Sequence, residues 1–325
     1  MNETNGETAQ PKEQGKRQQW EQSLLERLAF ASLAEQRKSR RWSIFFRFFF
    51  AIYLLVLLLM VFTAGLGETP LTGKYTALVD LDGVIAADSA ASADNVIAGL
   101  RSAFDSSAKG VILRGNSPGG SPVQASYIND EIKRLRKEHP DKPLYAVIED
   151  VCASGCYYAV AAADKIYANK SSVVGSIGVL MNGFGFVDTL KKLGVERRLL
   201  TAGKDKGFLD PFSPLSPRHR EHAQQLLDAI HKQFIDVVKQ GRGAVLKENK
   251  DLFSGFYWSG DKALSLGLVD ALGSTGYVAR EVIGAEEIID FTPRQSVLDR
   301  FAKRVGMAMA QTLSTMLMTS LPRLY

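Results

Sequence analysis

Cysteine and histidine are scarce in this chain, which has two cysteines and four histidines among 325 residues. Two cysteines are too few for the disulfide framework that supports many small secreted folds. No histidine lies near Cys152 or Cys156 in sequence, which excludes a conventional zinc module. With 46% hydrophobic and 23% charged residues, the chain is too apolar to be disordered throughout. We therefore expect a globular protein with an apolar core and no structural metal.

Positive charge exceeds negative charge, with a formal net charge of +5, and the excess is unevenly distributed. A basic cluster comes just before a long apolar run and consists of Arg37, Lys38, Arg40, Arg41 and Arg47. Basic residues in this position are typical of proteins that contact anionic lipid headgroups. The cluster accounts for part of the positive charge, so we predict a lipid partner and no nucleic acid.

The apolar run covers residues 48–66 and contains neither a charge nor a proline. At about 1.5 Å per residue, a helix of this length nearly spans a hydrocarbon core of about 30 Å. A long polar segment precedes the run, which favours a retained anchor over a cleaved signal peptide. Because basic residues stay on the cytoplasmic side, everything after residue 67 should lie outside. We expect a cytoplasmic tail (1–43), a transmembrane anchor (44–66) and a linker (67–74).

Strand and helix patterns alternate in the part after the linker. The expected strands and helices, in chain order, cover residues 75–80, 91–104, 110–114, 121–137, 143–148 and 153–163. This alternation predicts an α/β domain at 75–290 with a largely parallel sheet. A longer helix is expected at 217–241. The amphipathic segment 291–325 would lie on a membrane or on a partner subunit, a solvated terminal helix being the alternative.

The first candidate for chemistry is Asn116-Ser117-Pro118-Gly119-Gly120, directly after an expected strand. Ser121 and Pro122 then suit the first positions of the next helix. Two glycines at a strand-to-helix turn leave backbone N–H groups free beside a positive helix end, which suits a developing oxyanion. An ordinary tight turn is the alternative.

The second candidate is Cys152-Ala153-Ser154-Gly155-Cys156, followed by two tyrosines and a helix rich in small residues. Ser154 would stand at the start of that helix, with small neighbours that leave room for a substrate carbonyl. The alternative is that this serine only caps the helix.

A nucleophilic serine needs a base. Three of the histidines, His219, His222 and His231, fall on or near one polar helix, where a solvated face is the simpler explanation. A lysine can replace histidine if it is desolvated, because removal from water lowers its pKa. Lys204 and Lys206 are the candidates, at the end of a β-like run at 196–203 and before a proline-rich loop.

Five motifs occur in order: N-S-P-G-G, A-S-G-x-Y-Y, A-A-D-K-I-Y-A, V-G-S-I-G-V and G-x-x-K. Together they resemble the signal peptide peptidase A family of membrane-anchored serine proteases, the S49 peptidases. The resemblance runs from about residue 74 to about residue 273. It implies a ClpP/crotonase-like spiral of β-β-α units, preceded here by one transmembrane helix, and assembly into a homo-oligomeric ring.

The resemblance also implies roles for particular residues. Ser154 would be the nucleophile, Lys206 the general base, and Ser176 the group that orients the lysine amine. The backbone N–H groups of Gly119 and Gly155 would form the oxyanion hole. Gly207 stands where the family usually has aspartate, so Lys204 is kept as the alternative base.

Cys152 and Cys156 replace residues that are usually small in the family. A disulfide at the start of a helix would be strained, so we expect two buried packing residues. Oxidation outside the cell is the alternative.

The expected function is that of a serine endopeptidase with a Ser/Lys dyad and no cofactor or metal. It would cleave remnant signal peptides and other apolar peptides at the outer face of the bacterial inner membrane. The first alternative is a catalytically inactive scaffold that binds peptides. The second is a crotonase-like acyl-transfer enzyme, which an external domain disfavours because coenzyme A is cytoplasmic.

Overall fold

The computed structural model describes Trp20, Lys38 and residues 40–60 and 74–293, in two units, Met1–Thr72 and Gly73–Tyr325. In the first unit the helix Arg40–Met60 is long and apolar enough to cross a membrane, by length and composition alone. It overlaps the anchor expected at 44–66. Most of the tail (1–43), the linker (67–74) and the C-terminal segment (291–325) lies outside the described residues.

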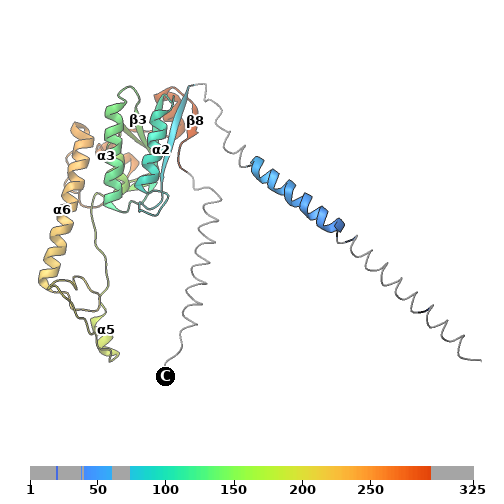
Figure 1. Ribbon diagram of the computed structural model, residues 1–325. Coiled ribbons are helices and arrows are strands. Elements are labelled where there is room, and N and C mark those ends of the chain that lie inside the picture. Colours follow the sequence, from blue (N-terminus) through green and yellow to red (C-terminus); the bar gives the residue numbers. More distant parts are fainter. Residues whose placement is uncertain (1–19, 21–37, 39, 61–73, 294–325) are drawn as a thin grey trace, which may run out of the picture. The chain divides into compact units, whose positions relative to one another are not determined.

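In the second unit, eight strands among the described residues form one sheet (Figure 1). The main path has the order β6-β5-β3-β2-β1-β8; off this path, β4 pairs with β3, and β7 pairs with β4. All the pairings are parallel except that of β5 with β6. The strands are β1 (Tyr75–Asp82), β2 (Gly110–Ser117), β3 (Leu144–Ala153), β4 (Lys165–Ala168), β5 (Val173–Gly175), β6 (Tyr257–Ser259), β7 (Ala271–Leu272) and β8 (Glu287–Asp290).

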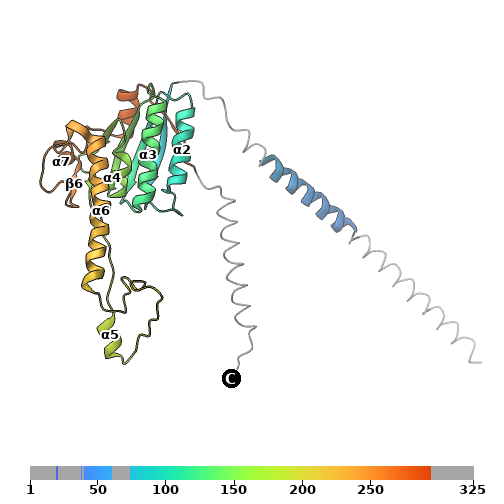
Figure 2. The same cartoon turned by 60° about the vertical axis from the view of Figure 1, so that its left-hand side comes forward.

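Helices connect these strands and cover both faces of the sheet (Figures 1 and 2). They are α2 (Ala93–Asp105), α3 (Pro122–Glu138), α4 (Gly155–Val160), α5 (Val187–Lys192), α6 (Pro217–Arg242), η1 (Gly243–Val245), α7 (Gly260–Ser265), α8 (Thr275–Tyr277) and the π-helix η2 (Val278–Ile283). Successive side chains of a strand point to opposite faces. Leu78, Ile112 and Val147 therefore pack with η2, while the neighbouring strand residues join the larger core that includes α2, α3 and α4.

Strand β3 changes neighbours along its length, and this change positions the site. Its first half pairs with β4 at Tyr145–Ile148, and its end pairs with β5 at Val151–Ala153. On the other side, the β2–β3 register shifts between Gly115 and Ser117. The ends of β2, β3 and β5 consequently meet at one place. This mostly parallel α/β architecture confirms the predicted fold class.

The strands and helices expected between residues 75 and 163 are all present, as is the helix expected at 217–241. The helix expected at 153–163 is shorter, because Ala153 still belongs to β3 and α4 ends at Val160. The β-like run expected at 196–203 was wrong, since no strand forms there. None of the strands in the described part of the chain lies beside this run to accept its hydrogen bonds, and Leu200 is 95% exposed.

Helix α6 extends beyond the sheet and carries a long excursion of the chain at its N-terminal end (Figure 2). Its buried residues, Phe234, Val238 and Arg242, all lie in the C-terminal part. We call residues 180–216, which include α5, the arm. The arm accompanies the exposed half of α6 and leaves the main body of the domain (Figures 1 and 2).

Candidate active site

Ser154 occupies a sharp turn between β3 and α4. Its backbone has φ 53° and ψ −123°, a left-handed conformation that is costly for a residue with a β-carbon. The turn is held by pairing of Ala153 with Gly175, and by the Ser154 amide, which donates to the Gly175 carbonyl at 2.8 Å. The surrounding sheet therefore enforces a conformation that the isolated residue would avoid.

The side chain of Ser154 does not cap the helix that follows it. Five other helices begin with a serine whose hydroxyl accepts an amide of the first turn, namely Ser92, Ser121, Ser216, Ser259 and Ser274. Ser154 is the exception, and it lines a cavity instead. The helix-cap alternative does not account for this serine.

Ser176 lies beside Ser154 because their strands are neighbours. It follows the last residue of β5, has φ 52°, and donates its amide to the Phe256 carbonyl at 2.8 Å. Ser176 and Ser154 are both half-buried and line the same cavity. The structure thus brings together two of the three side chains expected in the catalytic group.

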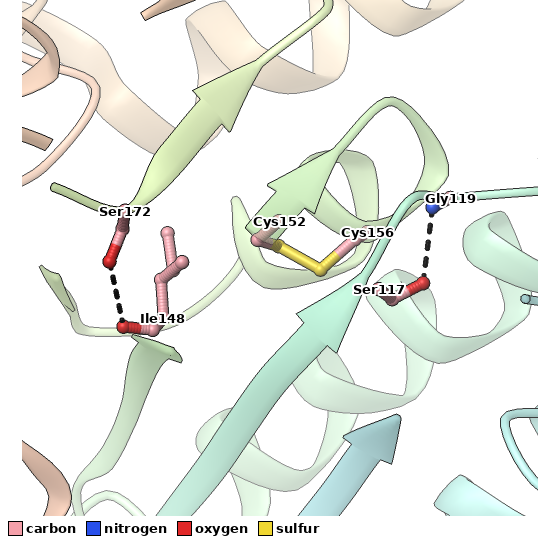
Figure 3. The surroundings of a disulfide bond; sticks show 6 residues. All are labelled: Ser117, Gly119, Ile148, Cys152, Cys156 and Ser172. Atoms are coloured by element: carbon pink, nitrogen blue, oxygen red, sulfur yellow. Dashed lines mark hydrogen bonds between the residues drawn. A yellow bond between two sulfur atoms is a disulfide. The ribbon is translucent and has the colours of Figure 1, made fainter. Parts of the chain in front are cut away.

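The glycine turn after β2 also reaches Ser154. A β-carbon on Gly119 would lie 2.7 Å from the Ala153 oxygen and from the Gly155 nitrogen, and 2.8 Å from the Ser154 β-carbon. Only a glycine allows this approach, and its φ of +98° is also a glycine conformation. The Gly119 amide donates to the Ser117 hydroxyl at 3.1 Å (Figure 3).

Gly120 is pinned against the loop after β1. A β-carbon there would lie 2.1 Å from the Ile85 oxygen, which accepts the Ser121 amide at 2.8 Å. The Gly120 nitrogen would lie 3.2 Å from a β-carbon built on Gly155. Gly120 and Gly155 line the cavity, so backbone N–H groups from both motifs stand beside Ser154.

The cavity has a volume of about 740 Å³ and a largely apolar wall. Sequence reasoning missed this wall, whose apolar side chains include Val123, Tyr127, Tyr158, Leu180, Ile230 and Phe234. A signal was present, because Val123 and Tyr127 share one helix face at i, i+4 and are 54% and 55% exposed. Two large exposed apolar side chains on an amphipathic helix indicate a binding surface.

Neither expected base lies in this cavity, and the described residues that line it include no lysine and no histidine. Lys204 and Lys206 are exposed on the arm. Asp205, between them, accepts from Arg218 at 2.9 Å and lies 3.2 Å from the His219 ring.

The helix itself gives the separation of the arm lysines from the cavity. Asp205 is bound to the first turn of α6, whereas Ile230 and Phe234 of α6 line the cavity. At 1.5 Å per residue, Arg218 is about 18 to 24 Å from these two residues along the helix axis. Within one chain, the arm therefore does not bring a lysine to Ser154.

The two cysteines form a disulfide, contrary to the expectation of separate packing residues (Figure 3). Both are fully buried, and their α-carbons are 5.1 Å apart. The expectation failed because Cys152 lies in strand β3 and not in the helix, so the chain turns between the two cysteines. The pair thus brackets Ser154.

A buried ion pair lies near Tyr157 of α4. Arg242 binds Asp270 with two nitrogens at 2.8 and 2.9 Å and donates to the Gly267 carbonyl. Burial lowers the pKa of Arg242, but the contacts with Asp270 outweigh it and the net pKa is raised. Tyr157 of α4 donates to the Leu268 carbonyl at 2.7 Å. Burial raises the pKa of Tyr157, which therefore stays neutral.

The part of the chain that the structure describes has no set of side chains suited to bind a metal ion. No group of three or more His, Cys, Asp or Glu side chains there could hold an ion. The chemistry available at the cavity is that of a hydroxyl and backbone N–H groups.

Comparison with known proteins gives a family model, "Peptidase family S49", that matches residues 136–287. A Synechocystis protein named "Putative protease slr0021" is 30% identical over 203 residues, which are 62% of this chain and 71% of that protein. The chloroplastic serine protease SPPA of Arabidopsis thaliana is 32% identical over 187 residues, 57% of this chain and 27% of that protein.

A Brucella abortus protein named as the Na(+)/H(+) antiporter NhaA is 44% identical over 210 residues. These are 64% of this chain but only 28% of that protein. A Methanocaldococcus jannaschii protein named as a protease is matched over 54% of its length. The chain therefore spans from about a quarter to about seven tenths of the length of these relatives, and the antiporter name describes a much longer protein.

Proposed function

Because this chain belongs to peptidase family S49, we propose that it is a membrane-anchored serine endopeptidase with Ser154 as its nucleophile. The observation that carries the proposal is the turn at Ser154. Its backbone is left-handed, its hydroxyl makes no helix-cap hydrogen bond, and its side chain lies beside an apolar cavity. Strain of this kind persists where the surroundings enforce it, and it is common at active sites. Apolar peptides, including the remnants of signal peptides, fit a wall of this character.

In the proposed reaction, the Ser154 oxygen attacks the scissile carbonyl carbon while a neutral lysine amine removes the hydroxyl proton. The tetrahedral oxyanion then collapses, the C–N bond breaks, and the lysine returns the proton to the leaving amine. Water, deprotonated by the same lysine, attacks the acyl-enzyme and releases the second product. No metal or cofactor takes part.

For the oxyanion hole we propose the backbone N–H of Gly155 together with that of Gly120. The sequence favoured Gly119 as the second donor. Its amide, however, donates to Ser117, and Gly120 rather than Gly119 lines the cavity. Two preorganised amides beside the attacking oxygen are the arrangement that stabilises such an oxyanion.

We propose Lys206 as the base, supplied to Ser154 by a neighbouring copy of the chain. Two observations support this assignment. None of the described residues that line the cavity is a lysine, and Lys206 lies on an arm with large exposed apolar side chains, including Leu180, Phe184, Leu193 and Leu200. Surfaces of this kind mark protein interfaces. Docking of the arm on a second copy would also remove the lysine from water, which a lysine base requires.

Mixing two inactive variants tests this arrangement. Ser154→Ala keeps the base and Lys206→Ala keeps the nucleophile, so a mixed assembly regains sites at which one chain supplies each. In an equal mixture about a quarter of the sites are complete, because each partner is intact half of the time. We expect hydrolysis near a quarter of the wild-type rate. No recovery, with confirmed mixing of subunits, would place both groups on one chain.

A parallel mixture with Lys204→Ala in place of Lys206→Ala decides between the two lysines. We expect Lys204→Ala to be active by itself. An inactive Lys204→Ala and an active Lys206→Ala would move the base to Lys204 and leave the function unchanged.

Labelling with a fluorophosphonate probe tests the function itself. The full chain in detergent should be labelled and should cleave an apolar signal-peptide sequence, and Ser154→Ala should lose both properties. An assembled, folded wild type that is neither labelled nor active would favour the inactive peptide-binding scaffold. The observation that favours this scaffold function is that the described residues lining the cavity include neither a lysine nor a histidine.

Membrane attachment is proposed through the helix Arg40–Met60, with the peptidase domain on the outer side. Basic residues before the apolar run support this orientation, since such residues stay in the cytoplasm. Protease added to intact spheroplasts should digest the domain that follows residue 73. Digestion only after lysis would reverse the orientation.

A further inference from the structure

The Cys152–Cys156 disulfide surrounds the nucleophile symmetrically, two residues before and two residues after Ser154. It joins the C-terminal end of strand β3 to the first turn of helix α4. We propose that this disulfide positions Ser154 for attack, so that the peptidase gains its activity only after the two thiols have been oxidised. The inference rests on the function proposed above and adds a condition for it.

The sheet holds Ser154 from the side of β3, but helix α4, on its other side, offers little support. Helix α4 has six residues, begins without a side-chain cap, and follows a left-handed residue. The backbone bonds that hold the turn are the Ser154 amide to the Gly175 carbonyl and the Tyr158 amide to the Ser154 carbonyl, at 2.8 and 3.0 Å. A covalent link across the turn removes open conformations that these two bonds and the pairing of β3 with β5 would still permit.

The disulfide also supports the opposite wall of the site. A β-carbon on Gly115 would lie 3.3 Å from the Cys156 sulfur and 3.4 Å from the Cys152 sulfur. The sulfur atoms therefore rest on strand β2, directly before its register shift. Beyond the shift, Ser117 pairs with Cys152 and accepts the Gly119 amide (Figure 3). Both turns that meet at the cavity thus depend on the same bond.

Two thiols would not fit this place equally well. Unbonded sulfur atoms must lie farther apart than bonded ones, and strand β2 closes one side of the pocket at Gly115. Separation would move Cys156 with α4, or Cys152 with the end of β3, and either movement displaces Ser154. Displacements near 1 Å can lower catalysis by about 100-fold, because attack needs a near-ideal geometry.

The oxidation is a dithiol–disulfide exchange. The two thiols lose two electrons and two protons, and a disulfide of a thiol oxidase is reduced to its dithiol. Such oxidants act in extracytoplasmic compartments, whereas cytosolic thiols are kept reduced. A peptidase of this design would stay inactive until its domain had crossed the membrane. Both cysteines are fully buried, so oxidation would accompany folding.

The test compares the full wild-type chain in detergent with Cys152→Ala/Cys156→Ala. We expect kcat to fall at least about tenfold while KM changes less than about twofold, because most of the apolar wall lies on α3 and α6, which the disulfide does not touch. The matched control is Leu135→Ala, a buried core residue at the far end of α3, which lowers stability but should keep kcat. A double variant with the wild-type kcat would overturn the proposal.

A second measurement does not depend on activity. Hydrogen exchange of the backbone at 150–160 should be at least about tenfold faster in the double variant, and unchanged there in Leu135→Ala. Equal exchange in the wild type and the double variant would overturn the proposed role of the disulfide, even if the peptidase function stands. If the wild type lacks activity but exchange is still faster in the double variant, the peptidase function is refuted and the structural role of the disulfide stands. Alkylation of unfolded wild type, extracted with detergent from membranes under thiol-blocking conditions, should find no free thiol, and two free thiols would refute the disulfide.

Discussion

At the scale of single residues, the site depends on backbone conformations that most residues avoid. Ser154 and Ser176 both have φ near +50°, and Gly119 has φ +98°. Each is held by a neighbouring strand or loop, so the packing of the sheet offsets the unfavourable backbone energy of each conformation. The consequence is that three chain segments from distant parts of the sequence present their polar groups to one cavity.

Gly119→Ala should be the most damaging small substitution at the site. The new methyl group would lie within 2.8 Å of atoms of Ala153, Ser154 and Gly155, so the turn at Ser154 must move. We expect kcat/KM to fall by at least about 100-fold. Gly276→Ala is the control, since nothing lies within 4 Å of a β-carbon there. Peptide hydrolysis by both variants, with melting curves, measures the difference. An active Gly119→Ala would show that the two motifs do not cooperate.

Ser176→Ala tests the second hydroxyl of the cavity. Alanine keeps the β-carbon, so the backbone demand at φ 52° is the same and folding should be preserved. If the hydroxyl orients the base, kcat should fall about 10- to 100-fold at constant KM. Ser171→Ala, at an exposed turn, should have no effect. A change in KM alone would make Ser176 a substrate contact.

At the scale of elements, α2 and α3 are joined by a buried carboxylate. Glu131 is 8% exposed and binds Arg101 and Arg134, each at 2.7 Å. The hydrogen bond from Arg134 lowers the pKa of Glu131 from 4.5 to about 2, although burial opposes the change. The charged form is therefore the one that the fold stabilises.

The pH dependence of stability follows from this pKa. Because the folded pKa is the lower one, the contribution is complete above pH 4.5 and is lost as the pH falls towards about 2. Glu131→Gln should lower the free energy of unfolding by about 1 to 3 kcal/mol at pH 7. It should also reduce the slope of stability between those pH values.

Urea titrations across this pH range measure the effect. Glu138→Gln is the matched control, since Glu138 pairs with the same Arg134 on the helix surface and is 52% exposed at its side chain. An exposed pair of this kind contributes about 0.5 kcal/mol or less. Equal losses for the two variants would contradict the role assigned to burial.

At the scale of the whole molecule, the proposal that a second copy covers the apolar arm can be tested at one exposed residue of the arm. Leu200→Glu places a charge at a residue that is 95% exposed in one chain, so it should not disturb the fold. We expect a smaller assembly in analytical ultracentrifugation and activity lowered at least about tenfold. Tyr277→Glu, 43% exposed on α8, is the control. An unchanged assembly would remove the arm from the interface.

The sequence alone was sufficient for the elements whose patterns are local. The strand at 75–80, the helix at 121–137 and the long helix at 217–241 were predicted from periodicity and helix caps, and all are present. The site motifs could be identified because strand-to-turn glycines and a serine among small residues are contiguous in the chain. Short strands such as β5 and β7 were missed, since two or three residues form a strand only when a partner strand is already in place.

Only the tertiary structure decided how these pieces meet. It placed Ser176 beside Ser154 through the pairing of β3 with β5, and built an apolar wall from α3, α4 and α6. It also bonded Cys152 to Cys156 and left Lys206 on the arm, away from the cavity of its own chain. Local patterns specify helices and strands because the relevant contacts are within a few residues. A catalytic site joins residues far apart in sequence, so its geometry depends on how the whole sheet packs.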